Sequence, residues 1–250
     1  MDEAANRNTA PTIALPAALV TGVSSGLGQA LAQQLLDQAY QVFGISRRPP
    51  PVELHAKENF HWTKCDLANL DQVRSTLQLL LVPVHCLKLV ILNAGVLGLI
   101  QRMPDADLGE LKTTMDINLW SNKLVLDAVF ASCPPEQVVA ISSGAAVNGH
   151  HGWSGYSLSK AALNMLMQLY AADEPRTHFI ALAPGLIHTA MQDFIATEAD
   201  AEQFPALQRL IQARGTADMP GPAEAAERIL AILPTLTKHK SGSFVDIRSI

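Results

Sequence analysis

The chain alternates short β-branched and apolar runs with longer segments of helical period, and this alternation limits its fold more than any other feature. Several of the runs are apolar on both faces, as strands are when helices cover both sides of their sheet. The pattern predicts an α/β fold in a single domain, with a doubly wound, mostly parallel seven-stranded sheet and helices on both faces. The predicted strands are residues 17–21, 41–46, 60–66, 88–93, 137–142, 178–183 and 243–247, and the predicted helices are 26–38, 70–81, 107–132, 156–172 and 222–233.

Two segments stand outside this alternation. Residues 1–14 contain early acids but no basic stretch or long apolar run, so we expect a flexible tail rather than a signal peptide. Roughly 35 residues separate the sixth predicted strand from the last predicted helix, and excursions of this length are usually lids or binding loops. The apolar spacing in "FPALQRLI" predicts short helices there. We therefore expect one domain over residues 15–250, with a substrate lid at about 186–220.

Composition narrows the possible functions. A net charge of −5 without a run of lysine or arginine argues against nucleic-acid binding, and no apolar run is long enough to span a membrane. The three scattered cysteines, Cys65, Cys86 and Cys133, indicate reduced thiols in a cytoplasmic protein. His150 and His151 have no acid or cysteine spaced to complete a metal site, so no metal is expected.

A glycine-rich turn, "TGVSSGLG", follows the first predicted strand and opens the first helix. Gly22, Gly26 and Gly28 allow a sharp turn and a close approach of the backbone to a pyrophosphate, which the N–H groups of the helix N-terminus would bind. Ser24, Ser25 and Leu27 lie within the same turn. The alternative is that the glycines only form a tight connection between a strand and a helix. The turn lies at the first strand–helix junction of the alternating pattern, which favours a nucleotide site.

The end of the second strand, "GISRRPP", indicates which dinucleotide is bound. NAD sites usually place an acid here to bind the ribose 2′-hydroxyl, whereas this chain has Ser46 followed by Arg47 and Arg48. A guanidinium group can pair with the oxygens of a 2′-phosphate. NADP(H) is therefore the expected cofactor, the alternative being two solvated surface arginines.

From about residue 17 to 247 the chain resembles the short-chain dehydrogenase/reductase family in its single-domain, Rossmann-type form. The resemblance is carried by TGVSSGLG, the pair Asp66-Leu67, the run Asn93-Ala94-Gly95, Asn118, Ser143, Tyr156-x-x-x-Lys160, and Pro184-Gly185 followed by Thr189. It implies that Asp66 and Leu67 flank the adenine and that Asn93, Ala94 and Gly95 border the cofactor. It also implies that Thr189 and the backbone of Ile187 hold the nicotinamide carboxamide, and that Pro184 and Gly185 bind the cofactor.

The same resemblance assigns the catalytic residues. Tyr156 and Lys160 are four apart on a predicted helix and share one face, so the ammonium is expected to lower the tyrosine pKa toward a working value. Lys160 is also implied to bind the nicotinamide ribose. Ser143 lies at a strand end, where its hydroxyl could bind the carbonyl oxygen that receives hydride. Asn118 is expected to hold a water in a proton relay.

The C-terminal third contains "GWSGYSLSKAALNM", "APGLIHTAMQ" and the closing "SGSFVDIR". In these segments it looks like the branch of sepiapterin reductases and microbial benzil reductases. On this resemblance we expect an oxidoreductase that transfers hydride from NADPH to a ketone of a small 1,2-dicarbonyl, with Tyr156 as proton donor. The substrate would contact Ser143, Trp153, Tyr156, Met191 and Asp246, although Trp153 could simply pack within its loop. The alternatives are a pterin reductase, in which Asp246 anchors the amino-pyrimidine, and a non-catalytic NADP-binding redox sensor. The family commonly pairs through helices 107–132 and 156–172, which implies a homodimer or homotetramer.

Overall fold

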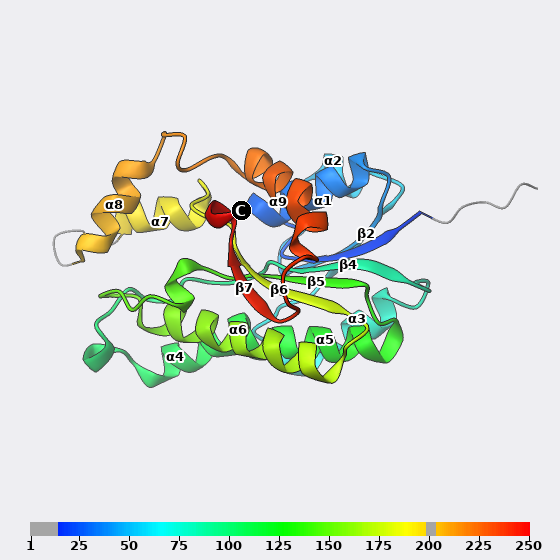
Figure 1. Cartoon of the computed structure of the whole chain (residues 1–250), viewed down its shortest axis with the longest axis horizontal. Helices are drawn as coiled ribbons and strands as arrows, with labels where there is room; N and C mark the ends of the chain where they lie inside the picture. Colours follow the sequence, from blue (N-terminus) through cyan, green and yellow to red (C-terminus); the bar gives the residue numbers. More distant parts are fainter. Residues whose placement is uncertain (1–14, 199–203) are drawn as a thin grey trace, which may run out of the picture.

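The computed structural model describes residues 15–198 and 204–250, and a parallel β-sheet forms its centre (Figure 1). The sheet has seven strands in the order β3-β2-β1-β4-β5-β6-β7, with every neighbouring pair parallel. This confirms the predicted doubly wound α/β architecture. The strands are β1 Ala17–Thr21, β2 Gln41–Ser46, β3 Phe60–Lys64, β4 Leu87–Leu92, β5 Gln137–Ile141, β6 His178–Ala183 and β7 Ser243–Asp246.

Helices cover both faces of the sheet (Figure 1). One apolar core lies between the sheet and α3, α5 and α6, and a second lies between the sheet and the packed pair α1 and α9. The central strands are buried on both faces, which is why their sequences are apolar at successive positions. The helices are α1 Gly26–Asp37, α2 Val52–His55, α3 Leu70–Leu80, α4 Leu108–Met115, α5 Ser121–Ser132, α6 Ser154–Asp173, α7 Ala190–Glu198, α8 Pro205–Ala213 and α9 Pro222–Leu236.

The helix predicted over 107–132 contains a local irregularity. Asp107 caps the N-terminus of α4 by accepting a hydrogen bond from the backbone of Glu110. A π-helical turn, Asp116–Trp120, then joins α4 to α5 without a break in the helical path. This wider turn contains the predicted catalytic residue Asn118, and π-turns within helices often occur at functional sites.

Other boundaries differ from the predictions by a few residues. The short helix α2 was not predicted, because its single turn is too short to show a helical period. Helix α9 continues beyond the predicted end at 233 and includes Pro234, two residues before its last residue, Leu236. The last strand ends at Asp246, and a 3₁₀ turn, Ile247–Ser249, follows.

The order of the strands determines where a ligand can bind. The chain runs from β1 outward through β2 to β3 and then returns to the other side of β1 with β4, so the direction of winding reverses between β1 and β4. In open parallel sheets, ligands bind at the carboxyl ends of the strands beside such a reversal. The segment predicted as a lid supplies α7 and α8, which pack against each other. The predicted N-terminal tail, residues 1–14, lies outside the described residues.

Within residues 15–198 and 204–250, no helix combines the length and apolarity needed to cross a bilayer. Cys65 and Cys133 are buried, Cys86 is exposed, and all three are free thiols.

Candidate active site

A cavity of about 1140 Å³ opens at the carboxyl ends of the strands. Its walls come from the loops that follow β1 to β6, together with α6, α7, α8 and the turn after β7. Every predicted cofactor-binding residue except Gly28 lines this cavity, and so do four of the predicted substrate residues: Ser143, Trp153, Tyr156 and Met191. Asn118 and Asp246 are not among the lining residues. The fold therefore brings together side chains that are up to about 170 residues apart in the sequence.

The glycine turn after β1 is closed by a hydrogen-bond network with the end of β4. The Thr21 hydroxyl oxygen accepts from the backbone N–H groups of Asn93 and Ala94, both at 3.0 Å, and the Asn93 amide donates to the Thr21 carbonyl at 2.9 Å. A Cβ atom on Gly28 would lie 2.3 Å from the Gly22 carbonyl oxygen and 2.4 Å from Asn93 Nδ2. Gly28 thus lets the turn close, because a side chain at this position would collide with the Gly22 carbonyl and the Asn93 amide.

The end of β2 presents two cations. The Ser46 hydroxyl accepts a hydrogen bond from Trp62 Nε1 and donates one to the Arg48 carbonyl, both at 2.7 Å, so it fixes the turn that carries the arginines. Arg47 and Arg48 are exposed and line the cavity, and neither forms a salt bridge within the described part of the chain. An anion could therefore approach both guanidinium groups.

These features fit a dinucleotide. The turn can close as it does only because Gly28 has no Cβ to collide with the Gly22 carbonyl, and Gly22 and Gly26 adopt φ angles of 81° and 59°, which favour glycine. Turns of this kind let the backbone approach a pyrophosphate. No carboxylate ends β2, where it would repel a 2′-phosphate. The lining residues therefore suit a nicotinamide cofactor that extends from the β2 end of the sheet toward β5 and β6.

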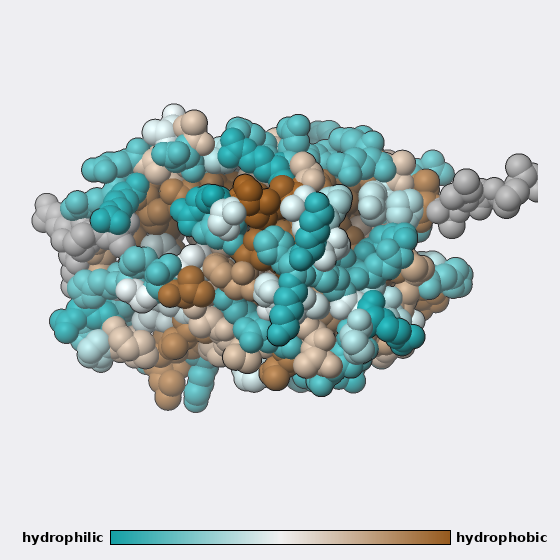
Figure 2. All heavy atoms as spheres, viewed as in Figure 1, coloured by the Kyte–Doolittle hydropathy of each residue, from teal (hydrophilic) through white to brown (hydrophobic). Residues whose placement is uncertain are grey.

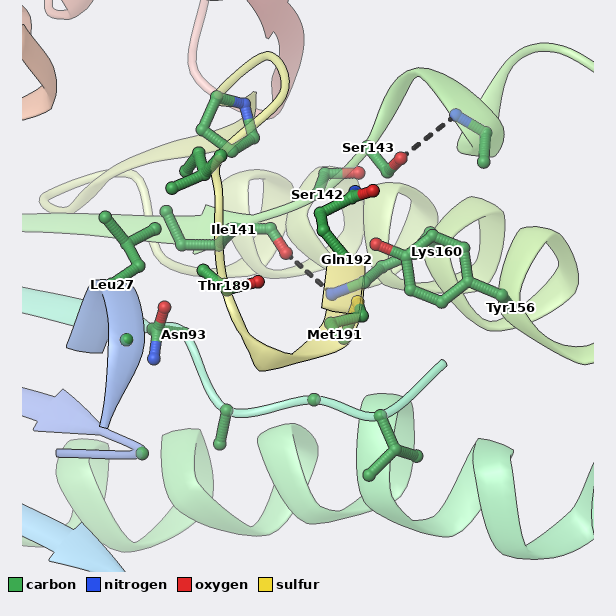
Figure 3. A pocket seen from close by; sticks show the side chains of 18 of the residues that line it. Leu27, Asn93, Ile141, Ser142, Ser143, Tyr156, Lys160, Thr189, Met191 and Gln192 are labelled. Atoms are coloured by element: carbon green, nitrogen blue, oxygen red, sulfur yellow. Dashed lines mark hydrogen bonds between the residues drawn. The ribbon is translucent and has the colours of Figure 1, made fainter. Parts of the chain in front are cut away.

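Ser143, Tyr156 and Lys160 converge at the other end of the cavity (Figure 3). Ser143 follows β5 and caps the next 3₁₀ turn, where its hydroxyl accepts from Ala145 N at 3.1 Å. Tyr156 and Lys160 lie one turn apart on α6. Lys160 is buried, its Nζ donates to the Ile141 carbonyl at 2.7 Å, and the same Nζ lies 5.7 Å from the centre of the Tyr156 ring.

The pKa of Tyr156 shifts in the opposite direction to the one expected from the sequence. Burial raises the pKa of Tyr156, and a hydrogen bond with the Ser143 side chain opposes this effect only in part. Burial also lowers the pKa of Lys160 to about 8. The expected lowering of the tyrosine pKa by the lysine ammonium is not found, because removal from water disfavours both charged forms. Tyr156 is therefore a neutral phenol at pH 7.

Asn118 is buried and held by the chain rather than directed into the cavity. Its amide donates to the Val96 carbonyl at 2.8 Å and to Ser159 Oγ at 2.9 Å, and its Oδ1 accepts from Val96 N at 2.8 Å. A Cβ on Gly95 would lie 3.1 Å from Asn118 Oδ1 and 3.4 Å from Lys160 Nζ. Asn118 thus fixes the β4 loop against the lysine, while its predicted role in holding a water stays a prediction.

Apolar side chains form the wall next to Tyr156. Trp153 and Tyr156 have ring centres 5.7 Å apart, and both pack on a cluster formed by the β4 loop and the helices of the predicted lid. The buried members of this cluster are Leu97, Ile195, Phe204 and Leu207, and Met191 and Leu210 pack against them. Trp153 therefore both packs in its loop and borders the cavity, so the two readings of this residue are compatible.

Asp246 does not lie where the pterin hypothesis needs it. Its carboxylate accepts from the backbone N of Arg248 at 3.0 Å and from Arg248 Nε at 2.9 Å, and it pairs with Nη2 as well. Arg248 borders the cavity instead, with its side chain near Gly144 and Gly185. The 3₁₀ turn after β7 brings Arg248 back over Asp246, so the hydrogen-bonding oxygens of the carboxylate are occupied by Arg248.

Several lining residues were missed from the sequence, among them Asn148, Gln192, Ile195, Arg209, Leu210 and Arg248. Gln192 follows Met191 in the first turn of α7, so its position next to a predicted residue was the one available signal. Within the described residues, no three His, Cys, Asp or Glu side chains come together in a way that could hold a metal ion.

The chain is similar to a known protein family and to known enzymes. Residues 16–200 match the family model described as short chain dehydrogenase. The chain is 31% identical over 242 residues to a benzil reductase ((S)-benzoin forming) of Bacillus subtilis, covering 92% of this chain and 97% of the relative. It is 29% identical over 255 residues to a sepiapterin reductase of Rattus norvegicus, covering 93% and 96% of the two chains.

A solved structure shares the fold. The short-chain dehydrogenase/reductase YIR035C from Saccharomyces cerevisiae superposes with a TM-score of 0.82 at 23% identity, covering 93% of this chain and 96% of the other. The family model, the relatives along nearly their whole length and the shared fold lead to one conclusion: this chain belongs to the short-chain dehydrogenase/reductase family and is an oxidoreductase that acts on carbonyl or CH–OH groups.

Proposed function

We propose that this protein is an NADPH-dependent carbonyl reductase that reduces one ketone of a 1,2-dicarbonyl of the benzil type. The observation that carries the proposal is the meeting of the Ser143 and Tyr156 hydroxyls at the end of the cavity, against the apolar wall of Trp153 and Met191. Two hydroxyls suit a carbonyl oxygen, and apolar walls suit aryl groups. Relatives named as benzil reductases support the same choice.

The cofactor residues have distinct roles in this proposal. Arg47 and Arg48 would pair with the 2′-phosphate, the turn at Gly22–Gly28 would receive the pyrophosphate, and Asp66 and Leu67 would flank the adenine. Asn93, Ala94 and Gly95 would border the ribose, and Pro184, Gly185, Ile187 and Thr189 would hold the nicotinamide end. When bound, NADPH supplies the hydride that the chain's own side chains cannot provide.

The proton comes from Tyr156. Because the pKa of this phenol is raised, the hydroxyl is protonated at pH 7 and can give its proton to the oxygen as negative charge develops there. Ser143 donates a second hydrogen bond to the same oxygen. Lys160, with a pKa of about 8, is mostly charged at pH 7, and it stabilises the phenolate that remains and can return a proton to it.

Reduction of a pterin is the second candidate, favoured by the similarity to sepiapterin reductases over almost the whole chain. It ranks lower because the Asp246 carboxylate is paired with Arg248 rather than presented to the cavity. A redox sensor without turnover ranks lowest, since the chain retains Ser143, Tyr156 and Lys160 in contact with one cavity.

We also infer a homodimer or homotetramer formed through the helices around α4, α5 and α6. Large apolar side chains are exposed along them, namely Leu108, Trp120, Leu158, Met165 and Leu169. Figure 2 shows apolar atoms at the surface over α4 and α6. Sedimentation of the purified protein would test this, and a monomer at micromolar concentration would contradict it.

A direct test of the proposed function follows NADPH oxidation by absorbance with a panel of carbonyl compounds. Benzil and an alkyl aryl diketone should be reduced with higher kcat/KM than sepiapterin. Efficient reduction of sepiapterin with no activity on benzil would reverse the order of the two candidates. No turnover of any carbonyl with NADPH or NADH would favour the sensor.

A further inference from the structure

The side chain of Gln192 is an unexplained polar group in the cavity. Gln192 lies in the first turn of α7, where its backbone N donates to the Thr189 carbonyl at 2.8 Å. Its Oε1 is buried and has no hydrogen-bond partner. In the view of Figure 3 the side chain extends from α7 toward Ser142, Ser143 and the Tyr156 hydroxyl.

An unpaired amide oxygen in this position costs free energy. Buried polar atoms almost always have a partner, because an unpaired one has lost its hydrogen bonds to water without replacing them. The cavity is also lined by the apolar side chains of Ile187, Met191 and Ile195, which offer no hydrogen bond to an amide. A molecule bound in the cavity can supply the missing partner.

The amide can present either of its two polar groups. Rotation about its last torsion exchanges Oε1, an acceptor, with Nε2, which carries two N–H donors, and the two orientations differ little in shape. A diketone has hydrogen-bond acceptors only, so when it is bound the amide would turn its Nε2 donors toward the ligand. Ser143 and Tyr156 already serve the carbonyl that is reduced, so the neighbouring carbonyl oxygen needs a different donor.

We infer that Gln192 recognises the second oxygen of a vicinal dicarbonyl and so sets the preference for 1,2-diketones over simple ketones. The inference rests on the proposed function, because it names a specificity residue of the same site. A site that is built to bond a substrate group discriminates strongly against analogues that lack the group, since its own polar atom is then left unpaired. Gln192 is accordingly a residue that binds substrate, not one that transfers a proton.

The experiment compares two substrates of one skeleton, 1-phenyl-1,2-propanedione and propiophenone, which lacks the second carbonyl. In the wild type the ratio of kcat/KM values should favour the diketone. In Gln192→Leu, which keeps the approximate size but has no polar atom, this ratio should fall about tenfold, the effect of one lost hydrogen bond of roughly 1.4 kcal/mol. Gln192→Glu, which keeps the shape but replaces the donor with an anion, should lower the ratio at least as much.

Gln72→Leu is the matched control, because Gln72 is exposed on α3 and does not line the cavity. It should leave the ratio unchanged. The dissociation constant for NADPH, measured by fluorescence titration of each variant, separates substrate binding from cofactor binding. It should not change in Gln192→Leu.

Three results would overturn the inference. A parallel fall of both kcat/KM values would show that Gln192 only supports the local structure. Weaker binding of NADPH by Gln192→Leu would show that the amide bonds to the nicotinamide instead. If the wild type reduces neither compound, the proposed function fails and the inference fails with it, whereas the first two results leave the proposed function standing.

Discussion

Lys160 lies one helical turn beyond Tyr156, with its Nζ 5.7 Å from the centre of the tyrosine ring and 2.7 Å from the Ile141 carbonyl oxygen. The ammonium is thus buried beside an aromatic face, with a strand carbonyl as its hydrogen-bond acceptor. A charge in this environment is costly to the folded protein. It is retained at a site where the proposed chemistry needs a charge next to a phenol.

Lys160→Met should therefore stabilise the protein at neutral pH while abolishing carbonyl reduction. The folded-state pKa of about 8 lies below the ordinary 10.5, so the unfolded chain binds more protons between these values and wild-type stability rises as pH increases from 8 to 10.5. Below pH 8 the penalty is fully present, at most about 3 kcal/mol. Loss of the bond to the Ile141 carbonyl offsets roughly 1 kcal/mol, so the expected gain is about 2 kcal/mol at pH 7.

Urea unfolding of both proteins at pH 7 and pH 10 would measure this difference. The advantage of the variant should shrink at the higher pH. A variant less stable than wild type at pH 7, or a difference independent of pH, would show that burial of the ammonium costs little.

Tyr156→Phe should lower kcat by roughly 100-fold or more, because general acids typically contribute 10²- to 10⁴-fold. The ring and its packing against Trp153 are retained, so NADPH binding and thermal stability should be close to wild type. Stopped-flow hydride transfer and fluorescence titration would check both parts. Turnover within a few-fold of wild type would eliminate Tyr156 as the proton donor.

Ser143→Ala should also lower kcat, by roughly 100-fold if the hydroxyl acts as an oxyanion donor. The same change removes the hydrogen bond that partly offsets the raised pKa of Tyr156, so this pKa should rise further. In the direction of alcohol oxidation, where the phenolate is the active form, the pH at half-maximal rate should move upward. An unchanged pH profile would place the serine away from the tyrosine hydroxyl in the working enzyme.

Arg47→Ala should raise the KM for NADPH roughly tenfold and leave the KM for NADH nearly unchanged, since only NADPH carries the 2′-phosphate that a guanidinium binds. Arg228→Ala, which removes an exposed arginine on α9 outside the cavity, is the control. Equal effects on the two cofactors would mean that Arg47 does not bind the 2′-phosphate.

Gly28→Ala should weaken NADPH binding more than tenfold, because the new Cβ would lie 2.3 Å from a backbone oxygen and force the turn open. Gly221→Ala is a matched control: Gly221 is exposed, its φ is −69°, and an added Cβ would meet no atom within 4 Å. Isothermal titration with NADPH would compare the two variants. Equal affinities would show that the turn tolerates a side chain.

The sequence was sufficient to predict the features that depend on local spacing. The strand ends, the glycine turn and the Tyr156–Lys160 pair are each defined by residues close together in the sequence. The structure places them at one edge of the sheet, as expected. The exposed Arg47 and Arg48 followed from their position at a strand end. Each of these inferences needed only a period or a short motif.

The features that depend on burial or on a chain reversal could not be predicted in this way. The raised pKa of Tyr156 results from how much of the surrounding structure excludes water, and no spacing encodes that. Asp246 and Arg248 are two residues apart, yet the 3₁₀ turn between them decides which one borders the cavity. The missing hydrogen-bond partner of Gln192 Oε1 depends on which side chains fold around it, and the position of Gln192 after Met191 does not encode that.

The π-helical turn at Asp116–Trp120 restricts how homologous chains can change in length. A π-turn contains one residue more than an α-helical turn, and each residue of an α-helix rotates the chain by about 100°. Deletion of one residue there would rotate α4 relative to α5, so either the Asn118 side chain would leave Val96 or the apolar face of α5 would leave the core. Insertions and deletions among homologues should therefore fall in the loops and spare the helical path from Leu108 to Ser132.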